Sequence, residues 1–361
     1  MTGPLPDGWA PDDVEHLSAC PVCGSEATSV IYTGLNDCMD RSTRGGWTLR
    51  GCGGCGSGYI SPRPTRATVG RLYSHGDYYT HTPPAPDSVA GSRLNRLRWS
   101  LFNGYLNHQY GYRLAPSFSV GRLVARLIPG ARGIAAQHVR ALARPAAGAR
   151  LLDIGCANGS FLLRMQGLGW SVTGIEVDPI AAAHARAAGL DIHQCSIEDH
   201  PLSPASFDAI TFSHVLEHLH DPVGAIRECA ALLRPGGTLW VGVPNLDGVG
   251  RRFMTKDWAP LDPPRHLVMF TGAGLRTVLS EAGFIDINDE PTVLDAGAWG
   301  ISASVDMAGG GNGLGRPRLS ARLRAVALRC DLRALRDPAV RENFNITARR
   351  GSATPSGEST P

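Results

Sequence analysis

The sequence predicts an α/β protein in which helices cover a parallel β-sheet and a small metal-stabilised domain comes first. Two observations lead to this expectation. From residue 150 onward, short apolar runs typical of buried strands alternate with segments that have the apolar spacing of helices. Near the N-terminus, two pairs of cysteines lie in a glycine-rich region that is too short to build a core of its own.

The overall composition is typical of a globular protein. Of the 361 residues, 43% are hydrophobic and 19% are charged. No apolar run is long enough to span a bilayer, and residues 1–19 lack the pattern of a secretory signal, so we expect a cytoplasmic protein without a membrane partner. The net charge is +3, Lys256 is the only lysine and no basic patch is concentrated, so we expect no nucleic-acid partner.

Shifts in composition divide the chain into five parts. Residues 1–18 predict a flexible tail, and residues 19–75 a zinc-binding domain. Residues 76–147 predict a helical linker. Residues 148–350 predict the α/β domain, and residues 351–361 are rich in Ser, Thr, Pro and Gly and predict a disordered tail.

Apolar spacing then predicts the individual elements in order. The linker has two segments with helical spacing, 93–112 and 119–143. The expected strands of the α/β domain are Leu151–Ile154, Val172–Ile175, Phe207–Phe212, Thr238–Val243, Ile285–Ile287 and Phe344–Ala348. The expected helices are 158–168, 179–188, 222–233 and 272–282, together with an arginine-rich amphipathic helix within 316–336.

The two cysteine pairs predict a structural zinc site. Each pair has two residues between its cysteines, a glycine follows each pair directly, and 28 residues separate the pairs. Four thiolates form a closed tetrahedral site, in which zinc stabilises the fold and does no chemistry. Four unligated thiols are the weaker alternative, and the isolated Cys38 is a competing ligand. The predicted ligands are Cys20, Cys23, Cys52 and Cys55.

A glycine loop after the first strand predicts a nucleoside-containing ligand. In Leu-Leu-Asp-Ile-Gly-Cys-Ala-Asn-Gly-Ser-Phe (151–161), Gly155 and Gly159 allow a ligand to approach the backbone. A dinucleotide-binding loop usually keeps a third glycine where Ala157 stands, and Asp153 would repel a pyrophosphate, so a ligand with a cationic amino end fits better. Glu176 lies 23 residues after Asp153 and can accept both hydroxyls of a ribose.

Four later segments complete a specific pattern: Ser196–Asp199, Phe207–Ile210, Val215–His218 and Leu233–Gly237. With the glycine loop, they resemble the class I S-adenosylmethionine (SAM)-dependent methyltransferases over residues 148–350. The resemblance implies a Rossmann-like, seven-stranded sheet whose last strand is antiparallel, and SAM as the cofactor. It implies cofactor contacts as follows: Asp153, Gly155, Cys156, Ala157 and Gly159 with the methionine part, Glu176 with the ribose, Ile197 and Glu198 with the adenine, and Ser213 and His214 beside the sulfonium.

Histidines and tyrosines outside this pattern are candidates for catalysis. His214 and His218 follow the fourth strand, at the sheet edge where ligands bind, and His266 lies in an insertion after the fifth strand. With the cysteine pairs and a tyrosine-rich segment, this arrangement resembles the zinc-containing sugar C-methyltransferases and related natural-product and glycan methyltransferases. The resemblance implies that His218 and His266 are acid/base residues and that Tyr78 or Tyr79 reaches over the substrate.

The sugar enzymes differ at one position. They carry a glutamate before the second histidine, whereas this sequence has Arg265, which can bind a phosphate or carboxylate of the acceptor. There are also plainer interpretations, in which His218 caps its loop and the tyrosines dock the zinc domain.

The sequence therefore predicts a SAM-dependent methyltransferase with a small-molecule acceptor. The acceptor classes are a sugar, a nucleotide sugar or a secondary metabolite, methylated on carbon or oxygen. One alternative is an RNA methyltransferase whose zinc domain recognises the substrate, and another is a non-catalytic partner protein. The sequence leaves the acceptor and the oligomeric state open.

Overall fold

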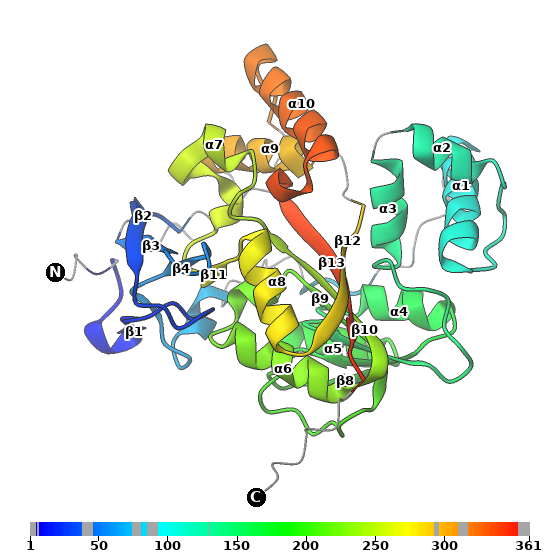
Figure 1. Ribbon diagram of the computed structural model, residues 1–361, viewed down its shortest axis with the longest axis horizontal. Helices are drawn as coiled ribbons and strands as arrows, with labels where there is room; N and C mark the ends of the chain where they lie inside the picture. The colour runs from blue at the N-terminus through cyan, green and yellow to red at the C-terminus, as the bar shows by residue number, and fades with distance from the viewer. Residues whose placement is uncertain are drawn as a thin grey trace, which may run out of the picture.

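The computed structural model describes residues 5, 7–37, 46–73, 81–84, 93–128, 130–291, 296–309 and 317–352. Within these ranges it contains sheets of seven, four and two strands (Figure 1). No helix in these ranges combines the length and the apolar character needed to cross a membrane.

The seven-stranded sheet has the strand order β12-β13-β10-β9-β6-β7-β8. β10, β9, β6, β7 and β8 are parallel to one another, whereas β13 is antiparallel to both β10 and β12. The predicted Rossmann-like sheet with a reversed last strand is thus confirmed. Its strands are β6 (Arg150–Ile154), β7 (Ser171–Ile175), β8 (Asp191–His193), β9 (Phe207–Ser213), β10 (Leu233–Pro244), β12 (Phe284–Asp289) and β13 (Asn343–Arg350).

Helices pack on both faces of this sheet. Leu151 and Leu152 are neighbours on β6 and point to opposite faces, as in any strand, and they belong to different buried clusters. The cluster of Leu152 includes residues of α6 (Pro222–Leu232) and α8 (Gly272–Glu281). The cluster of Leu151 includes residues of α4 (Ser160–Gly167), α5 (Pro179–Ala187) and the helices of the linker.

Local signals place the starts of two of these helices. The carboxylate of Asp178 accepts hydrogen bonds from the backbone N–H groups of Ile180 and Ala181, and α5 begins at the next residue, Pro179. Asp221 caps α6 in the same way, through the N–H of Gly224. A capping aspartate followed by proline satisfies unpaired N–H groups and presets the backbone for a helix.

The linker differs from the prediction. Its first helix, α1 (Arg93–Tyr110), is close to the predicted one, but the single helix expected at 119–143 is wrong. This segment forms α2 (Gly121–Leu127) and α3 (Ala131–His138), because Gly130 adopts a left-handed conformation with φ 76°. After α3, Arg140 and Ala141 also have positive φ, which ends helical structure there.

The C-terminal part contains one unexpected helix. α9 (Ala296–Ala308) was not predicted, whereas α10 (Ala321–Arg336) lies within the expected arginine-rich segment. Ala327, Cys330 and Ala334 form the buried stripe of α10, as an amphipathic helix requires. Strand β10 also begins five residues earlier than predicted, with a register shift between Leu233 and Thr238.

The N-terminal region forms a second sheet that includes a strand from the α/β domain. β2 (Thr28–Leu35), β3 (Trp47–Cys52) and β4 (Gly58–Ile60) form three strands of this sheet, and β11 (Val268–Met269) pairs antiparallel with β4. β1 (Val14–Glu15) and β5 (Arg63–Pro64) form the two-stranded sheet. Because β11 belongs to the insertion after β10, the insertion that carries His266 is fixed to the cysteine-containing sheet.

Candidate active site and metal-binding clusters

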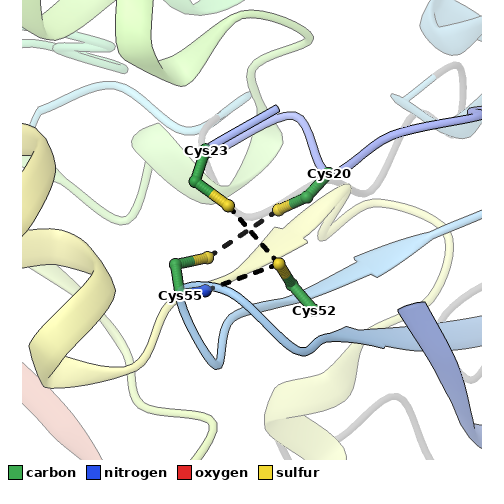
Figure 2. Close-up of side chains that lie close together, drawn as sticks. All are labelled: Cys20, Cys23, Cys52 and Cys55. Carbon is green, nitrogen blue, oxygen red and sulfur yellow. Dashed lines mark hydrogen bonds between the residues drawn. The ribbon is translucent and has the colours of Figure 1, made fainter. Parts of the chain in front are cut away.

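The four predicted zinc ligands lie together, as Figure 2 shows. The Sγ atoms of Cys20 and Cys55 are 3.8 Å apart, those of Cys23 and Cys52 are 3.4 Å apart, and all four lie within 4.8 Å of one another. Zinc–sulfur bonds of about 2.3 Å place tetrahedral sulfurs about 3.8 Å apart, so this set has the size of a zinc site. Cys38, the competing ligand, lies outside the described residues.

The local electrostatics also fit a cation at this cluster. The hydrogen bond with Cys55, together with burial, raises the pKa of the Cys20 thiol, and the same bond lowers the pKa of Cys55 to about 4. Four thiolates at these distances repel one another, so a divalent cation is needed for all four to ionise together. The backbone N–H groups of Val22 and Gly54 point at Sγ atoms of Cys20 and Cys52, at 3.4 and 3.3 Å.

The glycine loop lies at the carboxyl end of β6, against the next strand. Gly155 has φ +67°, and a Cβ there would lie 2.4 Å from Cγ2 of Val215, so the loop needs glycine at this position. The carboxylate of Glu176, at the end of β7, accepts hydrogen bonds from the N–H groups of Ala157 (2.7 Å) and Asp178 (2.9 Å). Burial raises the pKa of Glu176. The acidic side chain predicted to bind ribose therefore lies against the loop predicted to bind methionine.

Asp153 lies beneath this loop and is only 1% exposed. Its Oδ1 accepts hydrogen bonds from Arg140 and from the hydroxyl of Thr211, while its Oδ2 is buried and has no hydrogen-bond partner in the described part of the chain. Burial raises the pKa of Asp153, and the charge of Arg140 opposes this shift. The orphaned Oδ2 fits a cationic group such as the amino group of SAM.

Arg140 is a residue that the sequence analysis missed. Its guanidinium stacks on the ring of Phe161 at 3.6 Å from the centroid and donates to Asp153 and Thr211. Apolar spacing placed Arg140 inside a helix, and no pattern in the sequence pairs it with Asp153.

The remaining predicted cofactor residues follow β6, β8 and β9. Cys156 and Ile197 are buried, and Glu198 pairs with Arg66 at 3.1 Å. Ser213 ends β9, and His214 follows it with φ 56°. Residues 81–84 also lie against the site, because Asn158 donates to the carbonyl of Thr82 and His81 pairs with Asp178 at 2.9 Å.

Three histidines surround one buried carboxylate beyond the end of β9, and we call them, with that carboxylate, the histidine cluster: His214, Glu217, His218 and His266. Glu217 is 1% exposed, and its Oε1 lies 3.2 Å from Nδ1 of His214 and 3.9 Å from Nε2 of His266. The ring centroids of His218 and His266 are 4.8 Å apart. The two histidines predicted to act as acid and base are thus neighbours, although 47 residues separate them in the sequence.

The protonation states within the histidine cluster are set by burial and by charge. Burial, with the neighbouring His266, lowers the pKa of His218 to about 4, so this ring is neutral near pH 7. Burial raises the pKa of Glu217, but the hydrogen bond from His214 and the charges of the histidines outweigh it and lower the pKa overall. Tyr73 Oη lies 3.1 Å from Nδ1 of His218, whereas the predicted Tyr78 and Tyr79 lie outside the described residues.

The expectation that Arg265 binds an acceptor is wrong. The residue is 1% exposed, and its guanidinium is engaged by two carboxylates. Nη1 and Nη2 donate to Asp37, and Nε and Nη2 donate to Asp262. These two carboxylates raise its pKa despite its burial. Arg265 therefore ties the insertion to the N-terminal region.

Comparisons with known proteins agree with this architecture. A family model described as "Methyltransferase domain" matches residues 128–288. Over 105 residues, the chain is 42% identical to a ubiquinone biosynthesis O-methyltransferase of Xanthomonas campestris pv. campestris, which covers 27% of this chain and 44% of the relative. A protein of the same name from Xanthomonas axonopodis pv. citri is 41% identical over 116 residues, covering 30% and 48%. The chain thus spans less than half the length of these curated relatives.

Solved structures show weaker similarity. A possible histamine N-methyltransferase from Thermotoga maritima is 24% identical, with a TM-score of 0.37, and covers 52% of this chain and 82% of its own. A complex of the Haloferax volcanii Trm112 methyltransferase activator with a methyltransferase has 15% identity, a TM-score of 0.43 and coverage of 61% and 89%. The strand order, the glycine loop and the family match together support a class I SAM-dependent methyltransferase domain that includes residues 128–288.

Proposed function

We propose that this protein transfers the methyl group of SAM to a small-molecule acceptor, on carbon or oxygen. The candidate acceptors are a sugar, a nucleotide sugar or a secondary metabolite. The observation that carries the proposal is the histidine cluster, which lies beyond the carboxyl end of β9, the sheet edge that also bears the glycine loop. The relatives named ubiquinone biosynthesis O-methyltransferases support a small acceptor. We also propose a cytoplasmic location and no nucleic-acid partner, on the composition of the sequence.

In this proposal, SAM supplies an activated methyl group on a cationic sulfur, and the residues of the chain hold the reactants. The orphaned Oδ2 of Asp153 and the backbone at Gly155, Cys156, Ala157 and Gly159 would bind the methionine part. Glu176 would bind the ribose, Ile197 and Glu198 would contact the adenine, and Ser213 and His214 would border the sulfonium. Alignment of acceptor and methyl group supplies much of the rate enhancement in such a transfer.

A hydroxyl or an acidic C–H acceptor must also lose a proton, and we assign this task to His218 and His266. The Nδ1 of His218 lies 2.9 Å from the carbonyl of Arg265, and that of His266 lies 2.8 Å from the carbonyl of Pro260. Because a carbonyl only accepts hydrogen bonds, each Nδ1 carries the proton. The neutral form of each ring therefore has its lone pair on Nε2, which can take a proton from the acceptor. Tyr78 or Tyr79 would reach over the substrate.

We further propose that the four cysteines hold a structural zinc ion. The zinc would fix the sheet that contains β4 and β11, and so keep the insertion with His266 in position. This role follows from the closed set of four thiolates, which leaves no coordination position for a substrate.

Methyl-labelled SAM tests the proposed function. The purified protein is incubated with labelled SAM and a cell extract that is then split into RNA, protein and small-molecule fractions. We expect label in the small-molecule fraction. Label in RNA would overturn the proposal in favour of an RNA methyltransferase.

The His218→Asn and His266→Asn variants test the two assigned residues. We expect each to lose turnover by about 100-fold or more while the dissociation constant for SAM stays within about twofold. His200→Asn is the matched control, because His200 also pairs with a carboxylate (Glu228, 3.0 Å) but lies outside the histidine cluster. Full turnover in both test variants would refute the acid/base assignment.

A further inference from the structure

We infer that Glu217, His218 and His266 form a second metal site, for a divalent transition metal such as zinc, iron(II) or cobalt(II). One donor atom from each side chain lies within 4.8 Å of the other two. Two imidazoles and one carboxylate are a ligand set that these metals bind. The inference concerns the site of the proposed function, but binding of the metal requires neither SAM nor an acceptor.

Glu217 supplies the first argument for a cation. Glu217 is 1% exposed, and its Oε1 accepts a hydrogen bond from Nδ1 of His214. Its Oε2 is buried and has no hydrogen-bond partner in the described ranges of the chain. A buried carboxylate oxygen without a partner is costly, and native proteins normally satisfy such an atom with a donor or a cation. A cation bound by the Glu217 carboxylate would satisfy it.

The backbone around the histidines supplies the second argument. Each of the two rings donates its Nδ1–H to a backbone carbonyl, His218 to Arg265 and His266 to Pro260. Metal-binding histidines nearly always have this second hydrogen bond, which fixes the ring orientation and leaves the other nitrogen for the metal. Both histidines have this hydrogen bond, and both lie beside the same carboxylate. Capping of a loop would require only one such histidine.

The loop that offers these carbonyls is itself held in place. The guanidinium of Arg265 donates to Asp262 in the same loop and to Asp37 in the N-terminal region. The contact with Asp37 is buried, since Arg265 and Asp37 are 1% and 2% exposed. The ligands are therefore preorganised by contacts outside the site, as a metal site requires.

The distances between the donor atoms require a small movement of the side chains when a metal binds. His266 Nε2 and Glu217 Oε1 are 3.9 Å apart, whereas metal bonds of about 2.0–2.2 Å place tetrahedral ligands about 3.4 Å apart. These two donors must therefore approach by about 0.5 Å. Three protein ligands leave positions for water or for an acceptor oxygen, in contrast to the closed set of four cysteines. His214, bound to the same carboxylate, is 43% exposed in its side chain, so the histidine cluster reaches the surface.

With a metal bound, His218 and His266 would hold the cation instead of exchanging protons. The cation would then lower the pKa of an acceptor hydroxyl bound to it. Both accounts predict that the histidine variants lose activity, so the deciding measurement must detect the metal itself.

Titration with Co²⁺ provides that measurement. The whole 361-residue chain, with its cysteine cluster loaded with Zn²⁺, is titrated with Co²⁺ while visible absorption and heat are recorded. We expect one Co²⁺ per chain, with the d–d bands of nitrogen and oxygen ligands and without the sulfur-to-metal charge-transfer bands of a thiolate site. Glu217→Gln and His266→Asn should each weaken binding by about 10-fold or more. The control His200→Asn should bind Co²⁺ like the parent protein.

Two results would overturn the inference: no Co²⁺ bound by the parent protein beyond exchange into the cysteine cluster, or unchanged affinity in both Glu217→Gln and His266→Asn. The titration of the parent protein decides the question even if a variant fails to fold, and SAM binding by the variants reports their folding. If Co²⁺ binds as expected but no fraction of the extract is methylated, the proposed function fails and the metal site stands.

Discussion

At the scale of single residues, buried charged groups join parts of the chain that are distant in sequence. Arg265 is bound by Asp262 and by Asp37, which is 228 residues away. Arg140 is bound by Asp153 beneath the glycine loop. Removing one member of such a group leaves an uncompensated buried charge, so Arg265 and Arg140 hold distant parts of the site in place.

Glu342 is a buried carboxyl with a pH-dependent effect on stability. It is 4% exposed and accepts a hydrogen bond from the N–H of Gly250, and burial raises its pKa from 4.5 to about 7. The folded protein therefore keeps this proton at pH values where the unfolded chain has lost it. We expect Glu342 to lower the free energy of unfolding by about 3 kcal/mol as the pH rises from 4.5 to 7.

Urea unfolding at a series of pH values measures this effect. The matched control is Glu342→Gln, which cannot ionise and should show a flatter pH dependence over the same range. If the parent protein and Glu342→Gln have parallel pH profiles, Glu342 does not titrate as predicted.

At the scale of elements, the two cysteine pairs bring the segment before β2 next to the end of β3. Val22 and Cys52 belong to the same buried cluster as Leu267 and Phe270 next to β11. A metal bound by the four cysteines would therefore stabilise the N-terminal sheet and also the insertion that pairs with it.

The conformation of the glycine loop is determined locally, because the positive φ of Gly155 excludes most side chains.

Cys23→Ser tests the zinc assignment. We expect this variant to contain one zinc ion fewer per chain than the parent protein, because three thiolates bind zinc less tightly than four. Its melting temperature should also fall, because metal binding and folding are coupled. Elemental analysis and thermal unfolding measure both effects. Cys195→Ser is the control, since Cys195 lies outside the four-cysteine cluster, and equal zinc contents in the two variants would contradict the assignment.

At the scale of the whole molecule, the cysteine-containing sheet and the methyltransferase domain share structure. β11 is a strand of the N-terminal sheet although it lies between β10 and α8 in the sequence (Figure 1). Trp47 and Leu49 of β3 share a buried cluster with Trp258, Leu261 and Met269 of the insertion. Neither region buries these side chains without the other.

Removal of residues 1–73 tests this dependence. The truncated chain would expose Val268 and Met269, which are buried against the N-terminal sheet, and would remove Asp37 from Arg265. We expect aggregation or loss of cooperative unfolding, together with loss of SAM binding, measured by size-exclusion chromatography, calorimetry and urea unfolding. A monodisperse fragment that binds SAM as tightly as the full chain would show that the methyltransferase domain folds independently.

The sequence by itself determined the features that depend on local spacing. Alternating apolar runs predicted the parallel strands, because the period of the apolar residues follows from the geometry of each element. The resemblance to class I methyltransferases implied the reversed last strand. The cysteine pairs predicted their own cluster from their spacing. The helix expected at 119–143 was wrong because the apolar spacing continues across Pro129-Gly130, a dipeptide typical of turns.

Only the tertiary structure decided which distant residues meet. It paired β11 with β4, Arg265 with Asp37 and Arg140 with Asp153, and it brought His266 to Glu217 and His218. The sequence marked the histidines by their position near strand ends, but it gave no sign that Glu217 lies among them. Such contacts depend on how packed elements are placed in space, and the periodicity of a single element carries no information about that placement.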